Sequence, residues 1–164
     1  ARLMGAGRVI LTGTREDRLS IGRKMGADVT LNVRETDPVA AVMELTGGVG
    51  ADMVVECSGQ PAAAAQAFEL VRKNGRLSMN GVYHEPVTVP LNKIVQWNLR
   101  ITGPKAEGGW AMERAIPLLA DGRLDLKPLI THRFSLDDIQ QAFATYTGRV
   151  GGAIKVIVKP GGTS

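Results

Sequence analysis

Residues 51–59 read Ala-Asp-Met-Val-Val-Glu-Cys-Ser-Gly, a nearly continuous apolar run that ends in a turn. Such a run is typical of a strand that is buried on both faces of a parallel sheet. Pro61 stands where the first residue of a helix is expected, and Asn74-Gly75 is expected to end that helix. Residues 76–82 form the next predicted strand. This stretch decides the fold class, because a strand, a helix and a second strand of these lengths predict a parallel βαβ unit.

The same alternation of short strands and helices continues on both sides of this unit. Further predicted strands occupy 8–13, 28–32, 99–104, 128–134 and 153–158. Further predicted helices occupy 15–25, 36–45 and 108–121, and one more begins at a capping box of Ser135 and Asp138. The apolar face predicted for that last helix consists of Leu136, Ile139, Phe143 and Tyr146. The alternation predicts an α/β fold with a doubly wound parallel sheet and a domain boundary near Ala106.

Composition excludes several classes of protein. The length of 164 residues suits one domain. The net charge is +4, and the sequence contains no block of five like charges, so nucleic-acid binding has no support. The apolar runs are far shorter than the roughly 18 residues of a transmembrane helix, so we expect no membrane partner. Cys57 is the only cysteine, which excludes an internal disulfide and predicts a reducing, cytoplasmic location.

The turn after the first predicted strand contains a candidate anion site. Ligands of doubly wound sheets bind at the carboxyl ends of the strands, and Gly13, Thr14 and Arg15 follow such an end. Arg18 lies one helical turn further on. A hydroxyl, two guanidinium groups and the free amides of a helix start together suit a phosphate. The alternative is a solvated helix start with surface arginines.

Three further positions have both a functional and a structural interpretation. Cys57 and Ser58 follow a strand end, although a lone cysteine is usually a small buried residue and Ser58 could cap the next helix. Lys155 lies among apolar neighbours in the last strand, or simply on its exposed side. With Cys57, His84 and His132 show no metal-site spacing, so we expect no metal site in this chain. No nucleophilic triad or P-loop stands out, and we predict no catalytic residue here.

Several different short motifs, taken in their order along the chain, resemble the pattern of a known family. They are Lys24-Met25-Gly26-Ala27-Asp28, Leu45-Thr46-Gly47-Gly48-Val49-Gly50-Ala51-Asp52, Glu56-Cys57-Ser58-Gly59, Val71-Arg72-Lys73-Asn74-Gly75-Arg76-Leu77, residues 130–143 and Gly152-Ala153-Ile154-Lys155-Val156. Together they resemble the medium-chain, zinc-dependent alcohol, sorbitol and threonine dehydrogenases. The resemblance implies a Rossmann-like dinucleotide-binding domain over 1–106. It also implies that 107–164 is an α+β segment that returns to the catalytic domain.

The resemblance also carries an expectation about the start of the chain. In this family, the cofactor domain begins with a strand, a glycine-rich turn and a helix, and residues 1–6 look like the end of that helix. The first strand, the glycine-rich turn and the catalytic domain with its zinc ligands are therefore expected outside this sequence. The strands at 8–13 and 51–57 would then each lack one neighbour in the sheet. Unpaired edges cost stability and invite aggregation, so we expect marginal stability for the isolated chain.

Positions that match the family's cofactor site follow from the resemblance. Gly13 occupies the place where NAD-dependent members have an acidic residue, which favours NADP and leaves NAD possible. Thr14, Arg15 and Arg18 match the region around the adenosine ribose. The remaining matched positions are Cys57 and Ser58 beside the cofactor, Val82 near the nicotinamide, Pro104 and Ala106 at its carboxamide, and Lys155 at the phosphates.

The function implied by the resemblance is hydride transfer between an alcohol or polyol and NAD(P), with zinc assistance in the full-length protein. This chain is expected to contribute cofactor binding, and residues 88–103 the surface of a homodimer. The isolated chain is expected to be inactive or nearly so. Two alternatives remain open at this point: a nucleotide-binding module without catalysis, and a methyltransferase domain that uses S-adenosylmethionine.

Overall fold

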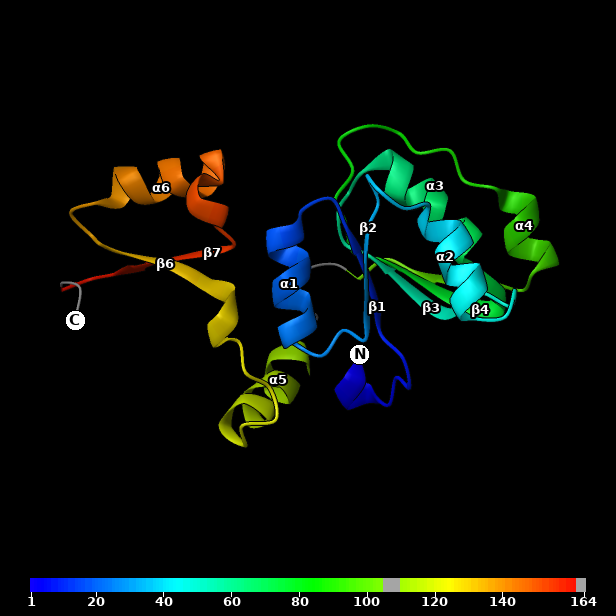
Figure 1. The fold of residues 1–164 in the computed structure, drawn as a ribbon, viewed down its shortest axis with the longest axis horizontal. Helices are drawn as coiled ribbons and strands as arrows, with labels where there is room; N and C mark the ends of the chain where they lie inside the picture. The colour runs from blue at the N-terminus through cyan, green and yellow to red at the C-terminus, as the bar shows by residue number, and fades with distance from the viewer. Residues whose placement is uncertain (105–109, 162–164) are drawn as a thin grey trace. The chain divides into compact units, whose positions relative to one another are not determined.

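The computed structural model describes residues 1–104 and 110–161 (Figure 1). The chain divides into two compact units, residues 35–114 and residues 1–34 together with 115–164. This division differs from the domain boundary expected near Ala106, and that boundary stays a prediction. Each unit contains parallel strands joined through helices, so the predicted α/β class is confirmed.

The unit 35–114 contains a three-stranded parallel sheet. Its strands are β3 (Ala51–Glu56), β4 (Val71–Met79) and β5 (Arg100–Thr102), in the order β3-β4-β5. Its helices include α2 (Pro38–Leu45), α3 (Pro61–Leu70) and α4 (Leu91–Gln96). In Figure 1, α2 and α3 lie side by side, and α3 makes the crossover from β3 to β4. The parallel βαβ unit predicted from residues 51–82 is therefore present.

The core of this unit forms where α3 packs on the sheet. Phe68 of α3 is 1% exposed and belongs to one cluster with Ala67, Val71, Leu77 and Leu99. Burying a phenylalanine stabilises a fold by about 1.5–3 kcal/mol relative to leaving it in water. The crossover helix thereby fixes β4 against β3 by filling the space above both strands.

The helix after Pro61 ends earlier than the sequence suggested. It ends at Leu70, and β4 already begins at Val71, which lies opposite Ala51 in the sheet. A register shift then separates this pair from the regular ladder, which resumes at Arg76. Gly75 is required at the irregularity, since a Cβ there would lie 2.5 Å from a methyl carbon of Val71. The Asn74-Gly75 signal therefore marks a kink inside a strand instead of a helix end.

The prediction that β3 is buried on both faces is wrong. Val54 packs against the core, whereas Met53 and Val55 on the opposite face are 52% and 50% exposed. The reason is that α3 covers only the face that carries Val54. An apolar run cannot reveal by itself how many of its faces are covered.

The second unit contains two pairs of parallel strands. Its main elements are β1 (Ile10–Gly13), α1 (Glu16–Lys24), β2 (Val29–Asn32), β6 (Ile130–Ser135), α6 (Ile139–Gly148) and β7 (Lys155–Lys159). Short 3-10 turns occupy Arg2–Met4, Lys127–Leu129 and Val150–Gly152, and α5 spans Trp110–Ala120. Among the strands described, β1 pairs only with β2 and β6 only with β7. Leu19 of α1 is 2% exposed and anchors that helix.

Two predictions about α6 are wrong. The Ser135 hydroxyl donates to the Asp138 carboxylate at 2.6 Å, and no side chain caps the backbone at the start of the helix. Phe143 and Tyr146, predicted on its apolar face, are 62% and 57% exposed. Ala142 and Thr145 are the buried residues of this helix, because its side toward β6 and β7 carries these smaller side chains.

Replacement of the central core residue tests this packing. Phe68→Ala is expected to lower the free energy of unfolding by about 3–5 kcal/mol, because a cavity remains beneath α3. Phe143→Ala is the matched control: its side chain is 62% exposed, so a loss below about 1 kcal/mol is expected. Urea unfolding of both variants, followed by circular dichroism, measures the difference. Equal losses in the two variants would contradict this account of the core.

Candidate functional site

The structure distributes the predicted site residues over both compact units. Gly13, Thr14, Arg15 and Arg18 lie together where β1 leads into α1, and Lys155 begins β7. These five residues belong to the unit formed by 1–34 and 115–164.

The other predicted residues belong to the unit 35–114. Cys57 and Ser58 directly follow β3, and Val82 follows β4. Pro104 is exposed just after β5. Ala106 lies outside the described residues, so its predicted contact with a carboxamide remains a prediction.

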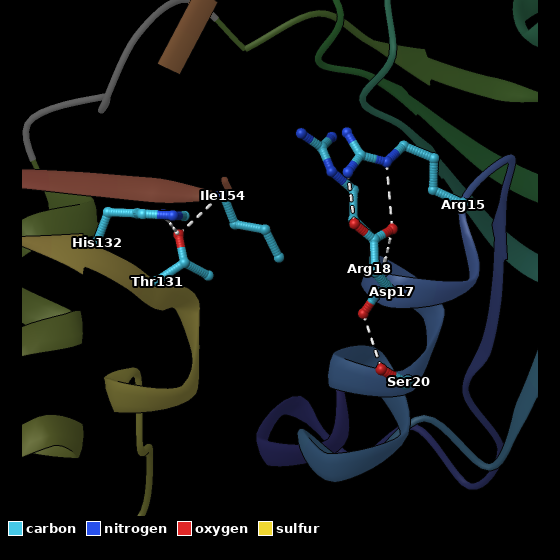
Figure 2. Close-up of polar contacts among 7 residues, drawn as sticks. All are labelled: Arg15, Asp17, Arg18, Ser20, Thr131, His132 and Ile154. Atoms are coloured by element: carbon cyan, nitrogen blue, oxygen red, sulfur yellow. Dashed lines mark hydrogen bonds and ion pairs between the residues drawn. The ribbon is translucent and has the colours of Figure 1, made fainter. Parts of the chain in front are cut away.

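Arg15 forms an ion pair with Asp17, a contact that the sequence pattern did not indicate. Its guanidinium donates to the Asp17 carboxylate, with the Arg15 Nε atom 3.1 Å from Asp17 Oδ1 (Figure 2). The same oxygen accepts the backbone N–H of Arg18 at 2.9 Å. These contacts, that from Arg15 foremost, hold the pKa of Asp17 below its ordinary value. An anion at this turn must therefore compete with Asp17 for Arg15.

The remaining groups at this turn are open to solvent. Thr14 and Arg18 are exposed, and Gly13 is half-buried above Leu19. A Cβ at Gly13 would lie 3.1 Å from Leu19 Cδ2, so a larger residue fits only if that methyl group moves slightly. Arg18 also lines an open groove of about 600 Å³, together with Tyr146 and Arg149.

Thr131 holds the backbone around Lys155. The Thr131 hydroxyl donates to the Lys155 carbonyl at 3.2 Å and accepts the Ile154 N–H at 3.0 Å. Figure 2 draws a contact between the same hydroxyl and His132, whose Nδ1 lies 3.0 Å from it. The side chain of Lys155 is exposed. Its backbone is therefore fixed at the start of β7 while its ammonium group is in solvent.

Glu56, the last residue of β3, organises the second group and was not predicted as a site residue. It is 5% exposed. Its carboxylate accepts the backbone N–H of Ser58 at 2.7 Å, the Ser58 hydroxyl at 2.5 Å and the Gly59 N–H at 3.3 Å. The Tyr83 hydroxyl, from the loop after β4, donates to the same carboxylate. One buried group thus joins the loops that follow two adjacent strands.

These hydrogen bonds determine the charge of Glu56. Burial acts to raise its pKa, but the hydrogen bonds from Ser58, Tyr83 and Gly59 outweigh burial and hold the pKa below the ordinary value of a glutamate carboxyl. Conversely, burial and the neighbouring carboxylate raise the pKa of Tyr83 above its ordinary 10. Near neutral pH, Glu56 is therefore a carboxylate and Tyr83 a neutral donor.

Two glycines bring the same loops into backbone contact. A Cβ at Gly59, where φ is +68°, would lie 2.3 Å from the Val82 carbonyl oxygen. A Cβ at Gly81 would lie 2.2 Å from the Gly59 nitrogen. The Glu56 carbonyl also accepts the N–H groups of Asn80 and Gly81. These glycines therefore permit a close approach between the two loops themselves.

The predicted residues of these loops lie at the surface. Cys57 is exposed, so the interpretation of this cysteine as a small buried residue is wrong, and its sulfur lies 3.7 Å from Asn80 Nδ2. The strand end directs Cys57 outward because Glu56 takes the inward position. The Ser58 hydroxyl accepts the Gln60 N–H at 3.2 Å, next to the start of α3. Val82 is 78% exposed.

The described parts of the chain, 1–104 and 110–161, contain no cluster of three or more histidine, cysteine or acidic residues that could hold a metal ion. No helix within these residues has the length and apolar character required to cross a membrane.

Comparisons with known proteins agree on one family. The family model for zinc-binding dehydrogenases matches residues 1–121. An alcohol dehydrogenase of Cupriavidus necator is 39% identical over 163 residues, which cover 98% of this chain and 44% of that protein. L-threonine 3-dehydrogenase of Bacillus subtilis is 37% identical over 164 residues, with coverage of 98% and 46%.

A solved structure shares the fold as well. It is a zinc-binding dehydrogenase from Sinorhizobium meliloti 1021 bound to NADP, with a TM-score of 0.88 and 28% identity. The match covers 97% of this chain and 47% of that one. The chain thus spans a little under half the length of the relatives that it matches. Because the family model matches well over half of the chain, the chain belongs to the zinc-binding dehydrogenase family.

Proposed function

We propose that this chain is the cofactor-binding portion of an oxidoreductase that transfers a hydride between an alcohol or polyol and a nicotinamide dinucleotide. The observation that supports this most is the pair of joined loops at the carboxyl ends of β3 and β4. Parallel sheets bind their ligands at that edge. Membership of the zinc-binding dehydrogenase family supports this class of ligand.

The turn at the start of α1 is proposed to bind the adenosine ribose. Thr14 and Arg18 offer an exposed hydroxyl and an exposed guanidinium, and Gly13 leaves the adjacent position without a carboxylate. These groups fit a ribose 2′-phosphate, so we propose NADP as the preferred cofactor, with NAD as the alternative. A relative from Sinorhizobium meliloti that binds NADP supports this choice. Asp17 weakens the site, since it neutralises Arg15.

The loops after β3 and β4 are proposed to bind the nicotinamide half. Ser58 offers a surface hydroxyl, and Val82 an exposed apolar side chain against which a ring can pack. Cys57 directly precedes Ser58 and is proposed to lie beside the cofactor. Pro104 and Ala106 are proposed to contact the carboxamide of the nicotinamide, and Lys155 the phosphates of the cofactor. A bound nicotinamide supplies the acceptor for the hydride. The role of these residues is to orient it and to limit the access of water.

No catalytic residue or metal ligand is assigned to this chain. In a longer parent protein, a bound zinc ion would polarise the alcohol oxygen and lower its pKa. The ligands for that ion are proposed outside residues 1–164.

Residues 88–103 are proposed as a surface for homodimers. The single cysteine fits the reducing cytoplasm, which we propose as the compartment.

Release of Arg15 tests the proposed phosphate site. Asp17→Asn is expected to tighten the binding of NADP⁺ by roughly three- to tenfold and to leave NAD⁺ almost unchanged, because only NADP⁺ carries the phosphate that Arg15 can reach. Glu16→Gln removes the same charge one residue away, from a carboxylate that pairs with Arg23, and serves as the control. Isothermal titration calorimetry measures the affinities of the unaltered chain and of both variants for both dinucleotides. Equal gains for both dinucleotides would contradict a phosphate contact at Arg15.

A carboxylate at the adjacent position should reverse the preference. In the full-length protein, Gly13→Asp is expected to lower the ratio of kcat/KM for NADP⁺ to that for NAD⁺ by at least roughly tenfold, because the new charge repels a 2′-phosphate and accepts ribose hydroxyls. Gly13→Asn places a neutral side chain of the same size against Leu19 and separates charge from crowding. An unchanged ratio in the aspartate variant would count against the proposed pocket.

A further inference from the structure

The carboxylate of Glu56 has an arrangement that the fold alone does not require. It is buried at the end of β3 and accepts hydrogen bonds from both loops at that edge. Strand ends can terminate in solvent without a buried charge, and burying a carboxylate is costly unless hydrogen bonds compensate. Here Ser58, Gly59 and Tyr83 supply that compensation. Among these donors, the Ser58 side chain is exposed, so its hydrogen bond to Glu56 affects a group that a ligand can contact.

Ser58 has a fixed hydrogen-bonding role because of Glu56. A hydroxyl has one proton and two lone pairs. The proton of Ser58 is donated to Glu56 at 2.5 Å, and one lone pair accepts the Gln60 N–H at 3.2 Å. One lone pair remains on this exposed side chain. A ligand that reaches Ser58 therefore meets an acceptor and no donor.

We propose that Glu56 is a positioning residue that makes Ser58 an obligate acceptor, so that this edge selects a ligand group that donates a hydrogen bond. The proposal rests on the proposed function, since the ligand is then a nicotinamide dinucleotide. A ribose hydroxyl or an amide NH₂ satisfies this requirement. An unprotonated phosphate oxygen does not, because it is itself only an acceptor.

The ionisation of Glu56 supports the direction of the Ser58 bond. A carboxylate can only accept, so the hydroxyl proton must lie on the Ser58 side of the contact. The hydrogen bonds on Glu56 hold its pKa below the ordinary value of a glutamate despite its burial, so the carboxylate persists through the neutral range. The Tyr83 hydroxyl donates to the same carboxylate. This bond links the loop after β4, which contains Val82, to the loop that contains Ser58.

Binding of NADP⁺ and NAD⁺ to the full chain, measured by calorimetry, tests the contact at Ser58. Ser58→Ala is expected to weaken both dinucleotides by roughly fivefold, because a donor group that they share loses its acceptor. Ser58→Thr, which retains the hydroxyl, should restore binding. Unchanged affinity for both dinucleotides in Ser58→Ala would overturn the proposal.

A double-mutant cycle separates positioning from simple loss of structure. If Glu56 acts through Ser58, the variant with both Glu56→Gln and Ser58→Ala should bind no more weakly than the weaker single variant. Additive losses would overturn the proposal. Glu69→Gln is the control, because Glu69 is an exposed carboxylate of the same unit, paired with Lys93, and should change affinity less than twofold.

A measurement without ligand keeps the two proposals apart. Carbon-13 NMR of the Glu56 carboxyl should give a pKa below the ordinary value of a glutamate in the unaltered chain and a higher pKa in Ser58→Ala and in Tyr83→Phe. A pKa that does not move in Ser58→Ala would overturn the positioning role even where dinucleotide binds. A titration as expected, with no binding of either dinucleotide to the full chain, would instead overturn the proposed function and its selected ligand group.

Discussion

Parallel pairing of β3 with β4 is the constraint on which the rest of the unit 35–114 depends. Two parallel strands require a crossover, and α3 supplies it by burying Phe68 over the sheet. Parallel pairing also places the carboxyl ends of both strands at one edge, so that the loops after Glu56 and Met79 must meet. Core packing and the location of the candidate site therefore follow from the same arrangement.

The meeting of these loops explains several residues at once. Gly59 and Gly81 lack side chains because the two backbones approach more closely than any Cβ would allow. Glu56 then takes the space beneath them and is stabilised as an anion by donors from both loops. The result is a hydrogen-bonded surface from which the side chains of Ser58 and Val82 are exposed. A polar group that is already held by hydrogen bonds loses less conformational freedom when it binds a ligand.

Much of the fold could be predicted from the sequence, because apolar runs and turn residues report local structure. The βαβ unit at 51–82 and the location of Ser58 at a strand end followed in this way. The Arg15–Asp17 pair and the Glu56–Tyr83 bond could not be predicted from patterning, since both depend on side-chain direction and the second joins residues 27 positions apart. The exposure of Phe143 was missed for a related reason: an apolar face does not state what covers it.

We propose that the joined loops at the carboxyl edge of β3 and β4 hold a nicotinamide dinucleotide. Titration of the ¹⁵N-labelled chain with NADP⁺, followed by amide chemical shifts, tests this binding. We expect the largest shifts at Ser58, Gly59 and Gly81, with a second set at Gly13 and Arg18. Shifts confined to the groove residues Tyr146 and Arg149, or no shifts at all, would contradict it.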